Sequence, residues 1–541
     1  MTDGSIIHSL LHGTEWISRI AIAIPMYNNQ ESFYAIASAF MNSVWQTLTL
    51  STLPLQQWLN GSYIHSLVGS LRQWRRGSWL MRWADAIGGV LVMLVFALAP
   101  FVNNELVAVL LAACGGYWIL LTLSEDEQTI ALPVDQSTSH SAPVRLSAHA
   151  EARTPYSVHR TPLTTPIHLL VLLYWSAVSI ATAMSPVKKA AFVGWQKLTL
   201  YLLFFALVAR VLRSPKIRAW VITVYLLAAL AVSVYGLQQW FSGTAALATW
   251  VDPASPLSKT TRVYSYLGNP NLLAGYLIPA IAFSVAAVFV WQSWMQKALA
   301  AVMVVVNGVC LALTFSRGGW IGLVVAVGVL LLLLVHWWSI YLPRFWQRWA
   351  LPIVLGTAAS VVILAMIVVE PLRDRVGSMF AGRGDSSNNF RINVWMAVIE
   401  MIKDHPIWGI GPGNVAFNKI YPLYMKARYS ALSAYSILLE VILEAGIIGF
   451  TCFVWLLVVT VTQGWNAIQR LRQVGDSHGD RFTNRDGLWL IAAIASLFGM
   501  IAHGLVDTVL YRPEVNTLWW LMFGMIASYY MPKELEVRGS D

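Results

Sequence analysis

The chain has 541 residues, of which 57% are hydrophobic and only 11% are charged, and its formal net charge is +10. Soluble domains carry about 25% charged residues, so this composition excludes an ordinary soluble protein. In a polytopic membrane protein a surplus of Lys and Arg anchors cytoplasmic loops, and we therefore expect no nucleic-acid partner despite the positive charge.

Apolar windows long enough to cross a lipid bilayer recur along nearly the whole sequence, since a spanning helix needs about 20 residues. They predict an all-α, polytopic membrane protein with about 12 transmembrane helices. The predicted spans are residues 87–102, 106–123, 167–184, 195–212, 219–240, 272–292, 298–315, 319–340, 350–370, 435–461, 488–509 and 515–532.

Arginine-rich segments indicate which side of the membrane each loop faces. "LRQWRRGSWLMRW", "ARVLRSPKIR", "LPRFWQR" and "IQRLRQ" fall on one side if the spans are counted as above. By the positive-inside rule this side is the cytoplasm, so we expect an inner (plasma) membrane protein with both termini cytoplasmic. Around the transmembrane domain 87–532 we predict a cytoplasmic or interfacial segment 1–86, a flexible cytoplasmic loop 124–166, an extracytoplasmic loop 371–434 and a cytoplasmic tail 533–541.

The stretch "LALTFSRGGW", residues 311–320, places Arg317 where an apolar span meets the predicted outer surface. An arginine at the bilayer centre costs about 2.5 to 3.5 kcal/mol on insertion scales, so it is expected to have a partner or a role. Gly318 and Gly319 let the backbone turn and let a ligand approach closely. Since a guanidinium group matches phosphate or carboxylate oxygens, Arg317 is a candidate anion-binding residue. The alternative is that it snorkels to lipid headgroups.

The stretch "GNPN", residues 268–271, predicts a tight turn before a helix, with Asn271 placed to cap that helix. Helix amino ends carry unpaired N–H groups and favour anions. Because Arg262 lies a few residues upstream, the turn and the cation could serve one site. As a turn alone, the motif is ordinary.

The predicted outer loop 371–434 is rich in arginine near its start. Arg373, Arg375, Arg383 and Arg391 lie there. An excess of cations near the outer membrane surface indicates an anionic ligand, although contact with lipid phosphates is the alternative interpretation.

The same loop holds "HPIWGIGPGN", residues 405–414. This glycine-rich stretch does not follow a predicted strand and lacks the lysine of a P-loop, so we exclude nucleotide binding. We predict a tight turn that brings the outer loop back towards the membrane.

Two pairs of ionisable residues lie four positions apart within predicted spans. His503 and Asp507 are predicted to share one helix face, with Arg512 following them, and Glu440 and Glu444 form a similar pair. Ionisable groups at this depth are functional by default, but interhelical hydrogen bonds explain them equally well.

Catalytic motifs of other kinds are missing from the sequence. No cluster of residues has metal-ligand spacing, and no nucleophile elbow or serine triad occurs. Any chemistry must therefore depend on arginines, a few carboxylates and one or two histidines, and we expect no cofactor.

Taken together, "SRGG" after a span, an arginine before "GNPN", Arg391 with Trp395, and "HPIWGIGPGN" resemble the O-antigen ligase and polymerase superfamily over roughly residues 170 to 530. "SVWQTLTL", "ALSAYSILLE" and "HGLVDTVLYRPEVNTLWW" look closer to its cyanobacterial branch, the IctB-type inorganic-carbon (bicarbonate) transporters. The superfamily resemblance implies a GT-C-like membrane glycosyltransferase that takes a glycan from undecaprenyl pyrophosphate without a metal. It also implies that Arg262, Arg317 and Arg391 bind the pyrophosphate.

One position departs from the superfamily pattern. Ligases of this group carry a histidine at the start of the span that corresponds to 435–461, where it is thought to assist the acceptor, whereas this chain has Tyr435. A tyrosine with a pKa near about 10 is a poor base at neutral pH. Either Glu440, Glu444 or Asp507 takes the role, or the transfer does not occur.

Three functions therefore stay open. The first is a ligase or polymerase acting on lipid-linked glycans at the outer face, and the second is a bicarbonate transporter or an accessory to carbon uptake. The third is a non-catalytic scaffold that binds the lipid-linked glycan. A carrier should show a midplane site between broken helices and often inverted repeats, and the sequence indicates neither.

Overall fold

The computed structural model describes residues 69, 71–75, 77–124, 165–243, 262–339, 343–368, 373, 377, 382, 386–477 and 485–530. Over these residues every regular element is a helix, and 10 of the helices are long and apolar enough to cross a membrane. The prediction of an all-α, polytopic membrane protein is confirmed.

Every predicted span coincides with a helix. These helices are α5 (Ala84–Leu98), α6 (Asn104–Leu123), α7 (Pro166–Met184), α8 (Lys188–Val211), α9 (Pro215–Phe241), α10 (Pro270–Val290), α11 (Trp294–Leu313), α12 (Arg317–Trp338), α13 (Arg344–Val368), α17 (Ile437–Ser477), α18 (Asp486–Gly504) and α19 (Pro513–Ser528). The 10 candidate spans omit α13 and α19, and α19 is only 16 residues long.

The end of α17 differs from the prediction. The helix continues well past the predicted limit at 461, so "IQRLRQ" is helical and not a loop. Ala, Ile, Gln, Arg and Leu are adequate helix formers, and hydrogen bonds across the bundle hold this extension. Arg470 donates to the Tyr529 carbonyl, and Arg472 donates to the hydroxyl of Ser339.

The core of the bundle lies around α18, which packs mainly on α12 and α10 and also contacts α17 and α19. Within its apolar window, 89% of the residues are buried, as expected for a helix that is apolar on all sides. Gly499 permits close contact with α12, because a Cβ atom there would lie 2.8 Å from the Gly322 carbonyl oxygen. Small residues of this kind let membrane helices approach closely.

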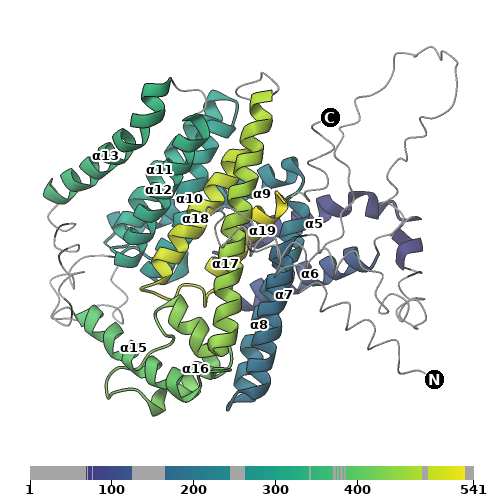
Figure 1. Cartoon of the computed structure of the whole chain (residues 1–541), viewed down its shortest axis with the longest axis vertical. Helices are drawn as coiled ribbons and strands as arrows, with labels where there is room; N and C mark the ends of the chain where they lie inside the picture. The colour runs from purple at the N-terminus through teal and green to yellow at the C-terminus, as the bar shows by residue number, and fades with distance from the viewer. Residues whose placement is uncertain are drawn as a thin grey trace, which may run out of the picture. The chain divides into compact units, whose positions relative to one another are not determined.

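Two helices, α15 (Ser386–Asp404) and α16 (Asn414–Ile420), occupy the predicted outer loop. They lie at the end of the bundle where α17 begins (Figure 1). Val398, Phe417 and Leu443 belong to one buried cluster that fixes α15 and α16 to the start of α17. We call this the α15 end of the bundle. Of the other predicted regions, 1–86, 124–166 and 533–541, the residues 1–68, 70, 76, 125–164 and 533–541 lie outside the described residues.

Candidate active site

The "SRGG" motif starts α12, directly after the turn that follows α11. Ser316 caps α12, because its hydroxyl accepts the Gly319 N–H at 3.1 Å, and its own N–H donates to the Thr314 hydroxyl at 3.2 Å. These bonds place Arg317 in the first turn of α12, with only 8% of its surface exposed.

The "GNPN" motif starts α10, but a different asparagine caps the helix. Asn269 accepts the Asn271 N–H at 2.8 Å, so the prediction that Asn271 is the cap is wrong. Pro270 takes the first helical position and pushes the cap to the residue before it. The Asn271 side chain is thereby free to bind other residues: its oxygen accepts from Arg262 at 3.3 Å, and its amide donates to Asp507.

Arg262 is tied to the turn before α12. Its Nε donates to the Thr314 carbonyl at 2.9 Å, and the backbone of Val263 donates to Leu313 at 3.1 Å. Burial lowers the pKa of Arg262 to about 10, so the guanidinium still carries its charge at neutral pH.

Helix α15 adds the third arginine. Arg391 donates to the Ser387 hydroxyl at 2.8 Å and pairs with Asp507 at 3.0 Å. One turn earlier on the same helix, Asn388 accepts from Arg317 at 2.7 Å. The Nε of Arg391 is buried and has no hydrogen-bond acceptor among the described residues.

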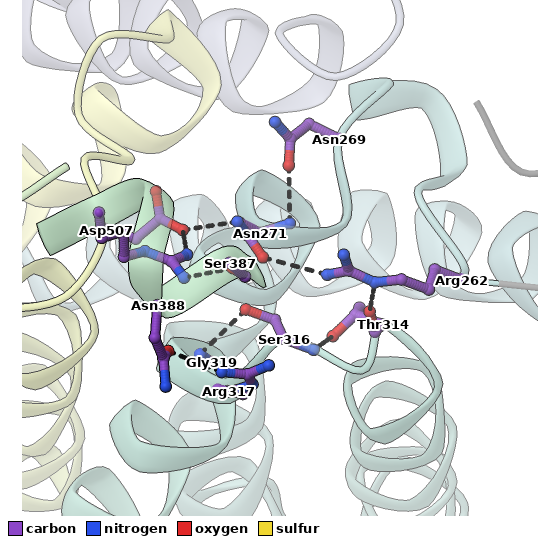
Figure 2. A network of polar contacts seen from close by, with 11 residues as sticks. Arg262, Asn269, Asn271, Thr314, Ser316, Arg317, Gly319, Ser387, Asn388 and Asp507 are labelled. Carbon is purple, nitrogen blue, oxygen red and sulfur yellow. Dashed lines mark hydrogen bonds and ion pairs between the residues drawn. The ribbon is translucent and has the colours of Figure 1, made fainter. Parts of the chain in front are cut away.

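Figure 2 shows how residues far apart in the chain meet at one place. Asp507 accepts from both Asn271 and Arg391, so one carboxylate joins the start of α10 to α15. We call this set the arginine network; it consists of Arg262, Asn271, Arg317, Ser387, Asn388, Arg391 and Asp507. Guanidinium groups held in fixed positions are suited to the oxygens of a phosphate or carboxylate ligand.

His503 does not share a helix face with Asp507, contrary to the prediction. Helix α18 ends at Gly504, and Asp507 belongs to the connection that follows. Because α18 has already ended, Asp507 is not held on its helix face, and its carboxylate pairs with Arg391 of α15. His503 is fully buried, and a Cβ atom at Gly318 would lie 2.7 Å from its ring; neither ring nitrogen has a hydrogen-bond partner among the described residues.

The remaining predicted cations lie elsewhere. Arg512 pairs with Glu514 at 3.4 Å, at the start of α19, and has no hydrogen bond or ion pair to the members of the arginine network among the contacts of the described residues. Arg373 is exposed, while Arg375 and Arg383 lie outside the described residues.

Tyr435 is held just before α17 in a left-handed conformation, with φ at 51°, and its ring packs against Phe390 of α15 at 5.6 Å between centroids. Burial raises the pKa of Tyr435 to about 12, so its hydroxyl keeps its proton at neutral pH. It can donate a hydrogen bond but is unsuited to act as a base.

The stretch "HPIWGIGPGN" fills a break in α17. Gly446 has φ at 62° and interrupts the helix, and a Cβ atom there would overlap the Ile407 carbonyl. The carbonyls released by the break accept new donors: Leu443 accepts from Ile410 at 2.8 Å, and Glu444 accepts from Gly411 at 3.0 Å. The Glu444 carboxylate also accepts the Gly413 N–H at 2.6 Å. The sequence prediction of a span over 435–461 did not include this break, although a glycine within the span is a signal for one.

Beside the arginine network, a cavity of about 140 Å³ lies between α7, α8, α17 and α19. Glu440 and Glu444 both line it from α17, as their spacing on one helix face predicts. The other polar lining residues were not among the predicted site residues, because they come from segments distant in the chain. They are Tyr174, Lys197, Tyr201, Asn414, Tyr511 and Asn516.

Residues 299–454 match the family model described as O-Antigen ligase. The matched segment includes Arg317, Arg391 and Tyr435, and it ends before Asp507. This match supports the predicted resemblance to the O-antigen ligase superfamily. No curated protein matches the chain.

Proposed function

We propose that this membrane protein is a glycosyltransferase of the O-antigen ligase type, which transfers a glycan from undecaprenyl pyrophosphate to an acceptor at the outer face of the inner membrane. The observation that carries the proposal is the convergence of Arg262, Arg317 and Arg391 from three separate parts of the chain. The family match over residues 299–454 supports the same class of activity.

The positions of other arginines support the orientation in this proposal. Gly194, near the start of α8, contacts Pro412 at the α15 end, so the end of α8 with Arg210 and Arg213 lies at the opposite end of the bundle. Arg470 and Arg472, in the last part of α17, lie at that opposite end too. By the positive-inside rule, these arginines support a cytoplasmic location for that end and an extracytoplasmic one for the α15 end.

In the proposed reaction, an oxygen of the acceptor hydroxyl attacks the anomeric carbon of the donor sugar. The bond from that carbon to the phosphate oxygen breaks, and undecaprenyl pyrophosphate leaves with the electron pair. The hydroxyl proton passes to a carboxylate. Arginines held in place before the reaction would stabilise the negative charge that develops on the leaving group.

As the base we propose Glu440, which lines the cavity together with Glu444. Tyr435 keeps its own proton, and Asp507 already accepts from Arg391 and Asn271. Glu444 accepts the Gly413 N–H. Glu440 lines the cavity, where an acceptor hydroxyl could reach it.

Transport of bicarbonate is the alternative function. A carrier often exposes the backbone carbonyls of a broken helix to its ion. Helix α17 is broken at Gly446, but the carbonyls of Leu443 and Glu444 there accept N–H groups from the glycine-rich stretch. This arrangement favours the transferase, because the break serves to fix the loop. A non-catalytic scaffold would use the same arginine network to bind the lipid-linked glycan but would not transfer the glycan.

A reconstituted assay separates the three functions. In proteoliposomes supplied with undecaprenyl pyrophosphate-linked glycan and acceptor, Arg317→Ala should lower transfer about 10²- to 10³-fold, the usual effect of removing one donor to a developing charge. Arg210→Ala is the matched control, because Arg210 pairs with Asp85 at the opposite end of the bundle. This variant should transfer glycan normally.

Two results would decide against the transferase. Loss of bicarbonate uptake in sealed vesicles of the Arg317→Ala variant, with unchanged glycan products, would favour the carrier. Pyrophosphate binding by the unmodified protein without any transfer would favour the scaffold.

A further inference from the structure

The cavity between α7, α8, α17 and α19 differs in chemistry from the arginine network. Two carboxylates, Glu440 and Glu444, face it from the first turns of α17, and Lys197 is the ammonium group that lines it from α8. The lining thus holds one ammonium group, against the three guanidinium groups of the arginine network, and offers fewer cations to a pyrophosphate head.

The rest of the lining suits hydroxyl groups. Tyr174, Tyr201 and Tyr511 bring phenol hydroxyls, which both donate and accept hydrogen bonds. Asn516 is fixed by donating to the Leu510 carbonyl at 2.6 Å, while its own carbonyl oxygen has no donor among the described residues. Carboxylate, phenol and amide groups together match the several hydroxyls of a sugar.

Aromatic surface completes the cavity. Trp519 and Trp520 line it from α19, and Phe453 lines it from α17. Aromatic rings offer large, rigid contact area to the C–H faces of a sugar ring, while nearby polar groups fix its orientation.

The cavity and the arginine network share one segment of chain. Asp507 belongs to the network, and Tyr511 lines the cavity four residues later. Four residues span at most about 14 Å even when fully extended, so the lining of the cavity begins within that distance of Asp507.

We infer that this cavity binds the terminal, uncharged sugar of the acceptor, with Glu440 accepting a hydrogen bond from the hydroxyl that attacks the donor. The inference rests on the proposed function and adds the class of acceptor: a neutral glycan end, not an anionic lipid headgroup. The hydroxyl oxygen forms the new bond to the anomeric carbon, its proton moves to the Glu440 carboxylate, and the pyrophosphate leaves with the electron pair of the broken bond.

Saturation-transfer NMR on the full chain in nanodiscs tests the cavity without any transfer assay. The probes are the methyl glycosides of glucose, galactose and N-acetylglucosamine, with tetramethylammonium as a cationic probe and inorganic pyrophosphate as an anionic one. The unmodified protein should bind at least one glycoside. Glu440→Gln and Asn516→Ala should each weaken that binding by at least about tenfold, as expected when a hydrogen bond to a buried polar group is lost.

Two controls keep the result interpretable. Glu400→Gln removes an exposed carboxylate of α15 that pairs with Lys403 and should change nothing. Arg317→Ala should lose pyrophosphate binding and keep glycoside binding, whereas Glu440→Gln should do the reverse. A thermal unfolding curve for each variant confirms that it is folded.

Three outcomes would overturn the inference: glycoside binding unchanged in both cavity variants, no glycoside binding by the unmodified protein, or binding of tetramethylammonium alone. If glycosides bind in the cavity but no glycan is ever transferred, the proposed function fails while the sugar site stands. If transfer occurs but the cavity variants transfer normally, the sugar site fails while the proposed function stands.

Discussion

Arginines at the two ends of the bundle perform different tasks. At the end opposite α15, Arg218 is 4% exposed, donates to the Leu212 carbonyl at 2.9 Å, pairs with Asp486 at 3.2 Å and stacks 4.0 Å from the Tyr529 ring. Each of these contacts joins neighbouring helix ends. At the α15 end, Arg262, Arg317 and Arg391 come from three segments and meet around Asn271, Asn388 and Asp507.

A buried arginine in a membrane protein is therefore not by itself a sign of a ligand. Arg218 is as buried as Arg317 and finds its partners within the protein, including an aromatic face. The distinguishing feature of the α15 end is convergence, because several guanidinium groups held at one place can act on one polyanion.

Removing one arginine from each end tests this difference most severely. Arg391→Ala should lower transfer by at least about 10²-fold, because it removes a donor and leaves the Asp507 carboxylate without its ion-pair partner. Arg218→Ala should leave the affinity for inorganic pyrophosphate unchanged and lower the free energy of unfolding by about 2 kcal/mol. The reconstituted transfer assay, isothermal titration with pyrophosphate and thermal unfolding measure these effects. Equal losses of pyrophosphate affinity would show that the ends do not differ.

The break in α17 tests whether the α15 end depends on its support. Gly446→Ala should destabilise the protein by about 3 kcal/mol or more, because the added methyl group meets the Ile407 carbonyl and φ is positive there. Gly328→Ala is the matched control, since a Cβ atom at Gly328 meets no atom within 4 Å, and it should be neutral or slightly stabilising. Unfolding temperatures in detergent compare the two. A neutral Gly446→Ala variant would contradict the account of the glycine-rich stretch.

The smallest effect is expected at Tyr435. Because its pKa is raised to about 12, the tyrosine stays protonated from pH 7 to 10, and its ionisation should add no rise in rate over that range. Tyr435→Phe should change the rate of transfer less than about threefold, which corresponds to the free energy of one weak hydrogen bond at most. A pH profile of both proteins is the measurement. If the rate climbs with pH in the unmodified protein and the climb disappears in the phenylalanine variant, Tyr435 is the base after all.

Long apolar windows and a low content of charged residues were enough to determine the membrane class and the places of the helices. A span must be long and apolar wherever it lies in the bundle, so this information is local in the sequence. Helix ends were less certain: the motif at 268–271 predicted a cap at Asn271, and Pro270 shows why the cap is Asn269. The predicted helix face shared by His503 and Asp507 failed because α18 ends at Gly504.

Packing between helices decided which polar groups meet. No periodicity in the sequence relates Arg262 to Arg391, or Glu440 to Lys197 and Asn516, because their proximity depends on how α10, α15, α8 and α19 pack. Buried polar groups require partners, and in a membrane protein those partners come from other helices. Local composition thus placed charged residues at the helix ends. Long-range contacts brought some of them together as the arginine network, beside a cavity that is lined by two glutamates.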